Sequence, residues 1–182
     1  MKKIALTFGL IAGAILSVMM IINHLLQDQL GFDRMEIIGY TSMVVAFLLI
    51  FFGVRSYRDN VAGGTVSFGR AFAVGALIAV VASVFYVATW EVIYYKFDPS
   101  FIEKYQAHAL DKERANGATE EAIAAKKAEL DKYAVMFRNP AINVAVSFVE
   151  PLPVALVIAL ISAAVLSRRR KDGVEGSRLA SA

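Results

Sequence analysis

Residues 4–26 make up a run of 23 residues without a formal charge. At about 1.5 Å per residue, a helix of this length crosses a hydrocarbon core of roughly 30 Å. Similar apolar stretches occupy about residues 35–54, 68–95 and 141–166. Hydrophobic residues make up 58% of the chain, well above the share of about 45–50% in soluble proteins. The sequence therefore predicts an all-α, polytopic integral membrane protein with four transmembrane helices.

The first stretch follows Lys2 and Lys3, a pattern that also opens cleaved signal peptides. The apolar core of a signal peptide is about 7–15 residues long and ends in an A-x-A-like site. The first stretch meets neither condition, so we expect an uncleaved span. The fourth stretch contains Pro151 and Pro153, which we expect to interrupt and kink its helix.

The positions of lysine and arginine predict the orientation in the membrane. Basic residues flank alternate ends of the spans, at Lys2, Lys3, Arg55, Arg58, Arg70, Arg168, Arg169, Arg170, Lys171 and Arg178. The positive-inside rule then places both termini in the cytoplasm. We expect a multi-pass protein of the bacterial inner membrane, with one domain over residues 1–167 and a basic cytoplasmic tail over residues 168–182.

The connection between the third and fourth spans, residues 96–140, holds eight basic and eight acidic residues. Balanced charge is compatible with export, so this segment is expected in the periplasm. A structureless loop of this length is uncommon in a compact protein. The segment is therefore expected to form an amphipathic helical hairpin over about residues 98–138, either lying on the membrane or packed on itself.

Local signals set the boundaries of this hairpin. Helix starts are expected at Asp98 with Pro99 and at Thr119, a stop at Asn116 with Gly117, and entry to the last span at Asn139 with Pro140. Apolar stripes run through Phe101, Tyr105 and Ala109 on the first helix and through Ile123, Leu130 and Phe137 on the second. Each helix is thus expected to bury one face.

Small residues recur at every fourth position in three of the spans. The rows are Ala5, Gly9, Gly13 and Ser17; Ala71, Gly75, Ala79 and Ser83; and Ala155, Ala159 and Ala163. Such rows let helix backbones approach closely inside a membrane. We expect them to pack the bundle internally, with a dimer seam as the alternative.

Four polar residues fall in the outer half of the predicted spans: Asn23, His24, Glu91 and Glu150. Ionisable groups within a membrane are costly, and they are a conventional place to look for function. One hypothesis is a pocket between His24, Glu91 and Glu150 that binds a cation, a proton or a small polar solute. The favoured interpretation is that these residues fix packing near the interface. No metal-ligand spacing is present, and His108 is expected to be solvated.

Motifs for catalysis are not found. The chain has no cysteine, and neither a G-x-S-x-G nor a phosphate-binding glycine loop occurs. Gly63 and Gly64 precede Ser67, an arrangement that a turn followed by a helix N-cap explains. We therefore predict no catalytic residues, no metal and no cofactor.

Several segments resemble a known family. Residues 52–59 read FGVRSYRD and residues 63–72 read GGTVSFGRAF, and later matches are FYVATWE at 85–91, DPSF at 98–101 and FVEPLP at 148–153. The chain resembles the bacterial membrane-protein family called domain of unknown function 4199. The signature loop of the resemblance contains Arg55, Arg58, Gly63, Gly64, Ser67 and Arg70. The resemblance implies a small integral membrane protein with several helices, and it supplies no activity, substrate or catalytic residues.

The sequence favours a non-catalytic structural or accessory component of the membrane. A binding or transport element for a small solute, an ion or a proton, built on Glu91 and Glu150, is the first alternative. An intramembrane enzyme using the same carboxylates is the second. The expected partners are the lipid bilayer and either a second copy or another membrane protein. The basic residues serve topology, so no nucleic acid is expected.

Overall fold

The computed structural model describes residues 1–167, and every regular element in that range is helical. The elements are α1 (Lys2–Leu25), α2 (Gln27–Leu30), α3 (Phe32–Asn60), α4 (Phe68–Val92), the π-helical turn η1 (Ile93–Phe97), α5 (Phe101–Ala115), α6 (Glu120–Phe137), α7 (Pro140–Val149) and α8 (Leu152–Leu166). The predicted all-α fold is confirmed. The basic run from Arg168 to Lys171, and Arg178, lie outside the described residues.

Four segments are long and apolar enough to cross a membrane: Lys2–Leu25, Phe32–Asn60, Phe68–Phe97 and Pro140–Leu166, with mean hydropathies of 2.3 to 2.4. Their outward faces carry large apolar side chains, such as Val45, Val84 and Ile161, which are 53–58% exposed. A continuous exposed apolar surface of this kind belongs in lipid. The chain is therefore a polytopic integral membrane protein, as the sequence predicts.

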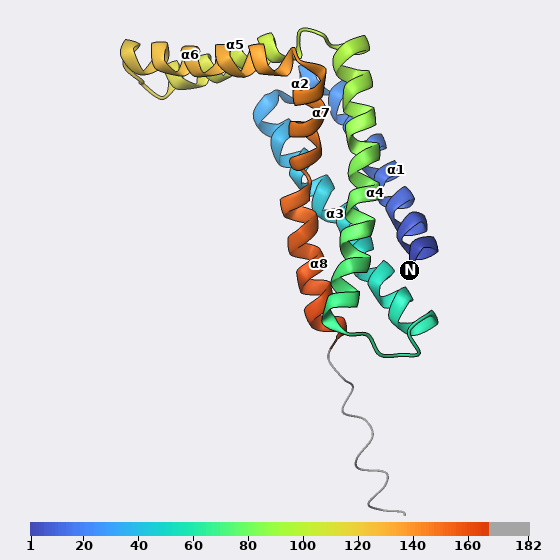
Figure 1. Cartoon of the computed structure of the whole chain (residues 1–182). Helices are drawn as coiled ribbons and strands as arrows, with labels where there is room; N and C mark the ends of the chain where they lie inside the picture. The colour runs from blue at the N-terminus through green and yellow to red at the C-terminus, as the bar shows by residue number, and fades with distance from the viewer. Residues whose placement is uncertain (168–182) are drawn as a thin grey trace, which may run out of the picture.

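Helices α3 and α4 form the centre of the bundle. Both pack against α1 and against α8, and they also contact each other. Phe47 and Ile50 from α3 and Ile78 from α4 are fully buried between them. Figure 1 shows the N-terminus, the α3–α4 connection and the end of α8 toward one end of the bundle, with α2, α5 and α6 at the other.

The rows of small residues lie at helix contacts inside the bundle. A Cβ atom added at Gly9 would lie 2.6 Å from Val81 Cβ, and one at Gly13 would lie 2.7 Å from Phe85 Cβ, so α1 and α4 touch closely there. A Cβ atom at Gly75 would lie 2.9 Å from the Cβ of Ala159 on α8. Ala79 and Ala159 are fully buried. The rows thus join α1 to α4 and α4 to α8.

The last span is interrupted where the sequence predicts a kink. Helix α7 ends at Val149 and α8 begins at Leu152, so Glu150 and Pro151 form the break. Proline lacks a backbone N–H and clashes with the preceding turn, which explains the interruption. The helical pattern resumes at once, because the Ala155 N–H donates to the Pro151 carbonyl at 3.1 Å.

Helices α5 and α6 pack against each other and project sideways from the end of the bundle (Figure 1). Gly117 has φ 77° where α5 stops, a conformation that suits glycine. The Thr119 hydroxyl accepts a hydrogen bond from the Ala122 N–H at 3.2 Å and caps α6 as predicted. Ile123 and Leu130 of the predicted apolar stripe are buried.

One predicted helix cap is wrong, and a second is formed without a side-chain hydrogen bond. Helix α5 begins at Phe101 rather than after Asp98, because the buried Asp98 carboxylate instead accepts hydrogen bonds from Ser100 (3.0 Å) and Lys104 (2.9 Å) and closes the turn after η1. Ser67 occupies the N-cap position of α4, but its side chain makes no capping hydrogen bond. The backbone of Ser67 is extended, and the helix begins at the next residue.

Candidate functional site

The main cavity has a volume of about 660 Å³ and lies at the end of the bundle where α5 and α6 project. Its walls come from α1, α3, α4, α5, α6 and α7, and residue 150 at the break of the last span also lines it. We call it the hairpin cavity. Its size is within the range of about 300–1,000 Å³ that is usual for small-molecule sites.

Aromatic side chains hold α5 against the bundle beside this cavity. The ring of Phe32, at the start of α3, lies 5.7 Å from that of Phe101 and 5.9 Å from that of Tyr105, both on α5. The Trp90 ring of α4 lies 4.9 Å from Phe101 in an edge-to-face arrangement. Edge-to-face pairs of this kind stabilise a fixed geometry, so the aromatic cluster positions the hairpin.

Charged groups add a second contact between α5 and α3. Lys112 Nζ donates to Asp33 Oδ1 at 2.7 Å, and His108 Nε2 lies 3.3 Å from the same oxygen. The hydrogen bond with Asp33 raises the pKa of the Lys112 ammonium, which therefore stays charged at neutral pH. His108 was expected to be solvated; its side chain is 33% exposed, and its ring also lies 5.2 Å from Phe32.

A second ion pair on the cavity wall lies within α6. Lys126 Nζ donates to Glu129 Oε2 at 3.1 Å, three residues along the helix. This bond raises the pKa of the Lys126 ammonium. Both lysines that line the hairpin cavity, Lys112 and Lys126, therefore already have a carboxylate partner.

Two further carboxylates line the hairpin cavity without such a partner. Among residues 1–167, no lysine, arginine or histidine nitrogen lies within 4.0 Å of the Glu36 or Glu150 carboxylate oxygens. The hydrogen bond that Glu150 receives comes from the Tyr86 hydroxyl on α4, at 3.0 Å from Oε2. Glu150 lies about ten residues, or roughly 15 Å, inside the last span.

A buried amide near the cavity was missed by the sequence analysis. Asn143 on α7 is fully buried, and its Oδ1 accepts hydrogen bonds from Trp90 Nε1 at 3.0 Å and from the Ser147 hydroxyl at 3.2 Å. Asn143 lies seven residues before Glu150, which places both on one helical face. That spacing could have identified it. Two polar contacts, Trp90–Asn143 and Tyr86–Glu150, therefore join α4 to the last span.

The structure brings three of the four predicted pocket residues to one site. Asn23, His24 and Glu150 all line the hairpin cavity. Asn23 Nδ2 donates to the Met35 carbonyl at 3.1 Å, which ties α1 to α3. Glu91 does not line the cavity, because it lies about 140° around α4 from Tyr86, at 100° per residue. The predicted triangle of His24, Glu91 and Glu150 is not formed.

The side chains that line the hairpin cavity define which groups it can offer. Within the part of the chain that the structure describes, no three histidine, aspartate or glutamate side chains come close enough to hold a metal ion. The carboxylates proposed for acid–base chemistry, Glu91 and Glu150, do not share the cavity. What the cavity does combine is a large aromatic surface, a few hydrogen-bonding groups and excess negative charge.

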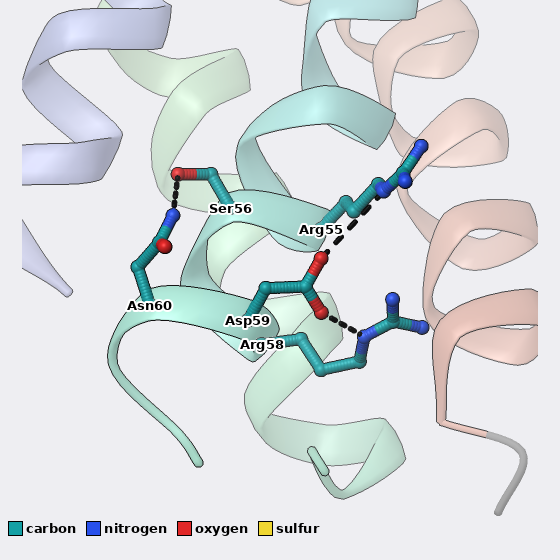
Figure 2. Close-up of polar contacts among 5 residues, drawn as sticks. All are labelled: Arg55, Ser56, Arg58, Asp59 and Asn60. Carbon is teal, nitrogen blue, oxygen red and sulfur yellow. Dashed lines mark hydrogen bonds and ion pairs between the residues drawn. The ribbon is translucent and has the colours of Figure 1, made fainter. Parts of the chain in front are cut away.

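The signature loop lies at the opposite end of the bundle from the hairpin cavity. Figure 2 shows Asp59 between two guanidinium groups, 2.7 Å from Arg58 Nε and 3.6 Å from Arg55 Nε. Asn60 Nδ2 donates to the Ser56 hydroxyl at 3.2 Å in the same view. Gly63 and Gly64 have φ of 68° and 87°, values that favour glycine, and they turn the chain toward α4. Arg70 is exposed in the first turn of α4.

The helices of residues 1–167 define the class as a polytopic, all-helical membrane protein. The model of the family described as protein of unknown function DUF4199 matches residues 7–168. The chain belongs to this family, which confirms the resemblance. No curated protein and no solved structure matches significantly.

Proposed function

We propose that this chain is a non-catalytic accessory protein of the bacterial inner membrane, and that its hairpin cavity binds a molecule dissolved in the bilayer. The observation that carries the proposal is an aromatic cavity with polar groups, whose wall includes Tyr40 and Glu150 from segments that can span the membrane. Cavities of this size and composition in other proteins hold small molecules. Binding is the first alternative that the sequence offered, and the geometry favours it.

Part of the cavity wall belongs to segments that can span the membrane. Helix α3 packs along α8 and has little contact with α7. Tyr40 on α3 lines the cavity and is 47% exposed, and Glu150 across from it is also exposed. Both residues belong to segments that are apolar enough to span the membrane. This part of the wall lies where lipid would surround the bundle, which supports a ligand that is dissolved in the bilayer.

The absence of catalysis is supported by how the interior polar groups are used. Thr89 donates to Ser17 at 2.7 Å and joins α4 to α1, while Trp90 and Tyr86 bond to the last span. Such contacts fix helix positions in a membrane. An acid–base mechanism would need Glu91 and Glu150 on one cavity, and only Glu150 lines it.

The proposed orientation places the hairpin cavity at the periplasmic face. Arg55 and Arg58 lie at the end of α3 farthest from α5 and α6, and the positive-inside rule assigns that end to the cytoplasm. Because the chain contains no cysteine, a thiol reagent labels only a cysteine that is introduced by mutation. The labelling then shows on which side of the membrane that position lies. In intact cells, an impermeant maleimide should label Asn116→Cys and leave Asn60→Cys unlabelled until the membrane is opened. The reverse pattern would overturn this orientation.

Ligand retention tests the proposed binding. Gly39 lines the cavity, and a Cβ atom there would have Asn23 Nδ2 as its nearest neighbour, at 3.8 Å. Gly39→Leu should therefore occupy the cavity without disturbing the bundle. Native mass spectrometry should find a bound bilayer molecule on the parent and on Gly69→Leu, where a Cβ atom meets nothing within 4 Å, but not on Gly39→Leu. Equal retention by all three proteins would refute the site.

A further inference from the structure

The walls of the hairpin cavity carry unbalanced charge. Four carboxylates line it, from Asp33, Glu36, Glu129 and Glu150, and two ammonium groups, from Lys112 and Lys126. Lys112 is paired with Asp33 at 2.7 Å, and Lys126 with Glu129 at 3.1 Å. The charge left over is that of Glu36 and Glu150.

These two carboxylates belong to segments that can span the membrane. Glu36 and Tyr40 are four residues apart on α3 and line the cavity together, since positions one turn apart share a helix face. Glu150, at the break of the last span, accepts a hydrogen bond from the Tyr86 hydroxyl at 3.0 Å. A carboxylate at the depth of Glu150 is costly unless a cation or several donors compensate it. A cationic ligand would supply that compensation.

Aromatic rings supply a second kind of cation contact. Tyr40, Tyr86, Trp90 and Tyr133 all line the hairpin cavity. The faces of such rings attract organic ammonium ions, and the attraction grows when water is excluded. A wall that combines aromatic faces with two unpaired carboxylates is complementary to an organic cation and repels an anion.

We propose that the hairpin cavity binds the ammonium head of a membrane-borne organic cation, with the apolar chain of the ligand extending into the surrounding lipid. The head lies among Glu36, Glu150 and the tyrosine rings. The inference rests on the proposed function and adds the charge and the chemical class of the ligand. Because Glu36, Tyr40 and Glu150 belong to segments that can span the membrane, the ligand is assigned to the bilayer.

The chain carries its own probe for a test, because Trp90 is its single tryptophan and lines the cavity. Trp90 fluorescence is followed in non-ionic maltoside micelles during titration with dodecyltrimethylammonium, dodecanol or dodecanoate. Tetramethylammonium serves as a head without a chain. We expect the long-chain cation to bind about tenfold more tightly than the alcohol or the anion, as a desolvated cation–π and ion-pair contact would give.

Matched carboxylate variants separate the cavity from general effects of charge. Glu36→Gln and Glu150→Gln keep side-chain shape, and each should reduce the preference for the cation, with the double variant losing it. Glu91→Gln makes the same chemical change outside the cavity and should bind as the parent does. The single variants keep the test valid if the double variant does not fold.

Each other outcome overturns the inference. Equal binding of the alcohol and the cation, blocked by Gly39→Leu, would leave the proposed function standing and refute the charge assignment. Equal binding of tetramethylammonium would refute a membrane-borne ligand. If no probe binds while the parent retains a different bilayer molecule, the ligand class is wrong. If neither is found, the proposed function fails as well.

Discussion

Lys112 and Asp33 lie 79 positions apart in the sequence and are joined by a 2.7 Å hydrogen bond between Nζ and Oδ1. This contact fastens α5 to the start of α3, beside the aromatic cluster around Phe32. The part of the hairpin cavity formed by α5 therefore depends on a charged contact near the interface and on edge-to-face aromatic pairs, rather than on lipid-embedded packing.

Removing the charged contact should loosen the hairpin. Lys112→Met deletes the donor to Asp33 and should make the Asn116–Gly117 turn more sensitive to limited proteolysis, by a few-fold because exposed ion pairs are weak. Lys127→Met is the control, since Lys127 bonds only within α6, to Asp131 at 2.7 Å. If both variants are cut at the parental rate, the ion pair does not hold the hairpin.

Enlarging a small residue at a helix contact should destabilise the bundle. Gly75→Leu adds a side chain whose Cβ atom alone would lie 2.9 Å from the Cβ of Ala159. Overpacking of this kind costs about 1–3 kcal/mol of stability. Thermal aggregation in detergent should begin at a lower temperature for Gly75→Leu than for the parent. Gly69→Leu, at an open position of the same helix, should behave as the parent does. Parental melting of Gly75→Leu would mean that the α4–α8 contact is not close.

Loss of the buried amide should cost more than loss of its hydroxyl neighbour. Asn143→Ala leaves the indole N–H of the half-buried Trp90 without its acceptor, a penalty of about 1 kcal/mol, which is the low end of the range for a buried donor. Ser147→Ala removes only a second donor to the same oxygen. We expect Asn143→Ala to lower thermal stability more and to shift the Trp90 emission spectrum. Equal effects of the two variants would argue against the Trp90–Asn143 bond.

Glu91 and Glu150 should act independently. Only Glu150 lines the hairpin cavity, and distant sites usually contribute additively to stability within about 0.3–0.5 kcal/mol. The free energies of unfolding of Glu91→Gln, Glu150→Gln and the double variant should therefore add. A larger coupling energy would show that the two carboxylates interact, as the predicted triangle with His24 requires.

The helical fold could be predicted from the sequence because its cause is local. Runs of apolar residues long enough to span lipid, together with Pro151 in the last one, determine the four spans and the break. The caps at Thr119 and Asn139 follow from side chains beside the helix ends that they cap. The prediction that Asp98 caps the following helix was wrong, because its carboxylate accepts a hydrogen bond from Lys104 Nζ and not from a backbone N–H at the start of that helix.

The candidate site could be predicted only in part, because its cause is not local. Asn23, His24 and Glu150 were found by their polarity inside apolar runs. The part of the cavity formed by α5 depends on contacts with Phe32 that no spacing reveals. The sequence indicates how deep Glu91 and Glu150 lie in the membrane, but not in which direction each side chain points from its helix. The grouping of Glu91 with Glu150 was wrong for this reason.

Quenching of Trp90 tests most directly whether the hairpin cavity holds a bilayer molecule. An amphiphile with a trimethylammonium head and a bromine-labelled chain quenches tryptophan on contact, and Trp90 is the single tryptophan of the chain. In the parent we predict strong quenching of Trp90 that saturates with the concentration of the probe. In Gly39→Leu we predict only the weak quenching, without saturation, that comes from probe dissolved in the micelle. Identical quenching curves for the two folded proteins would contradict binding in the hairpin cavity.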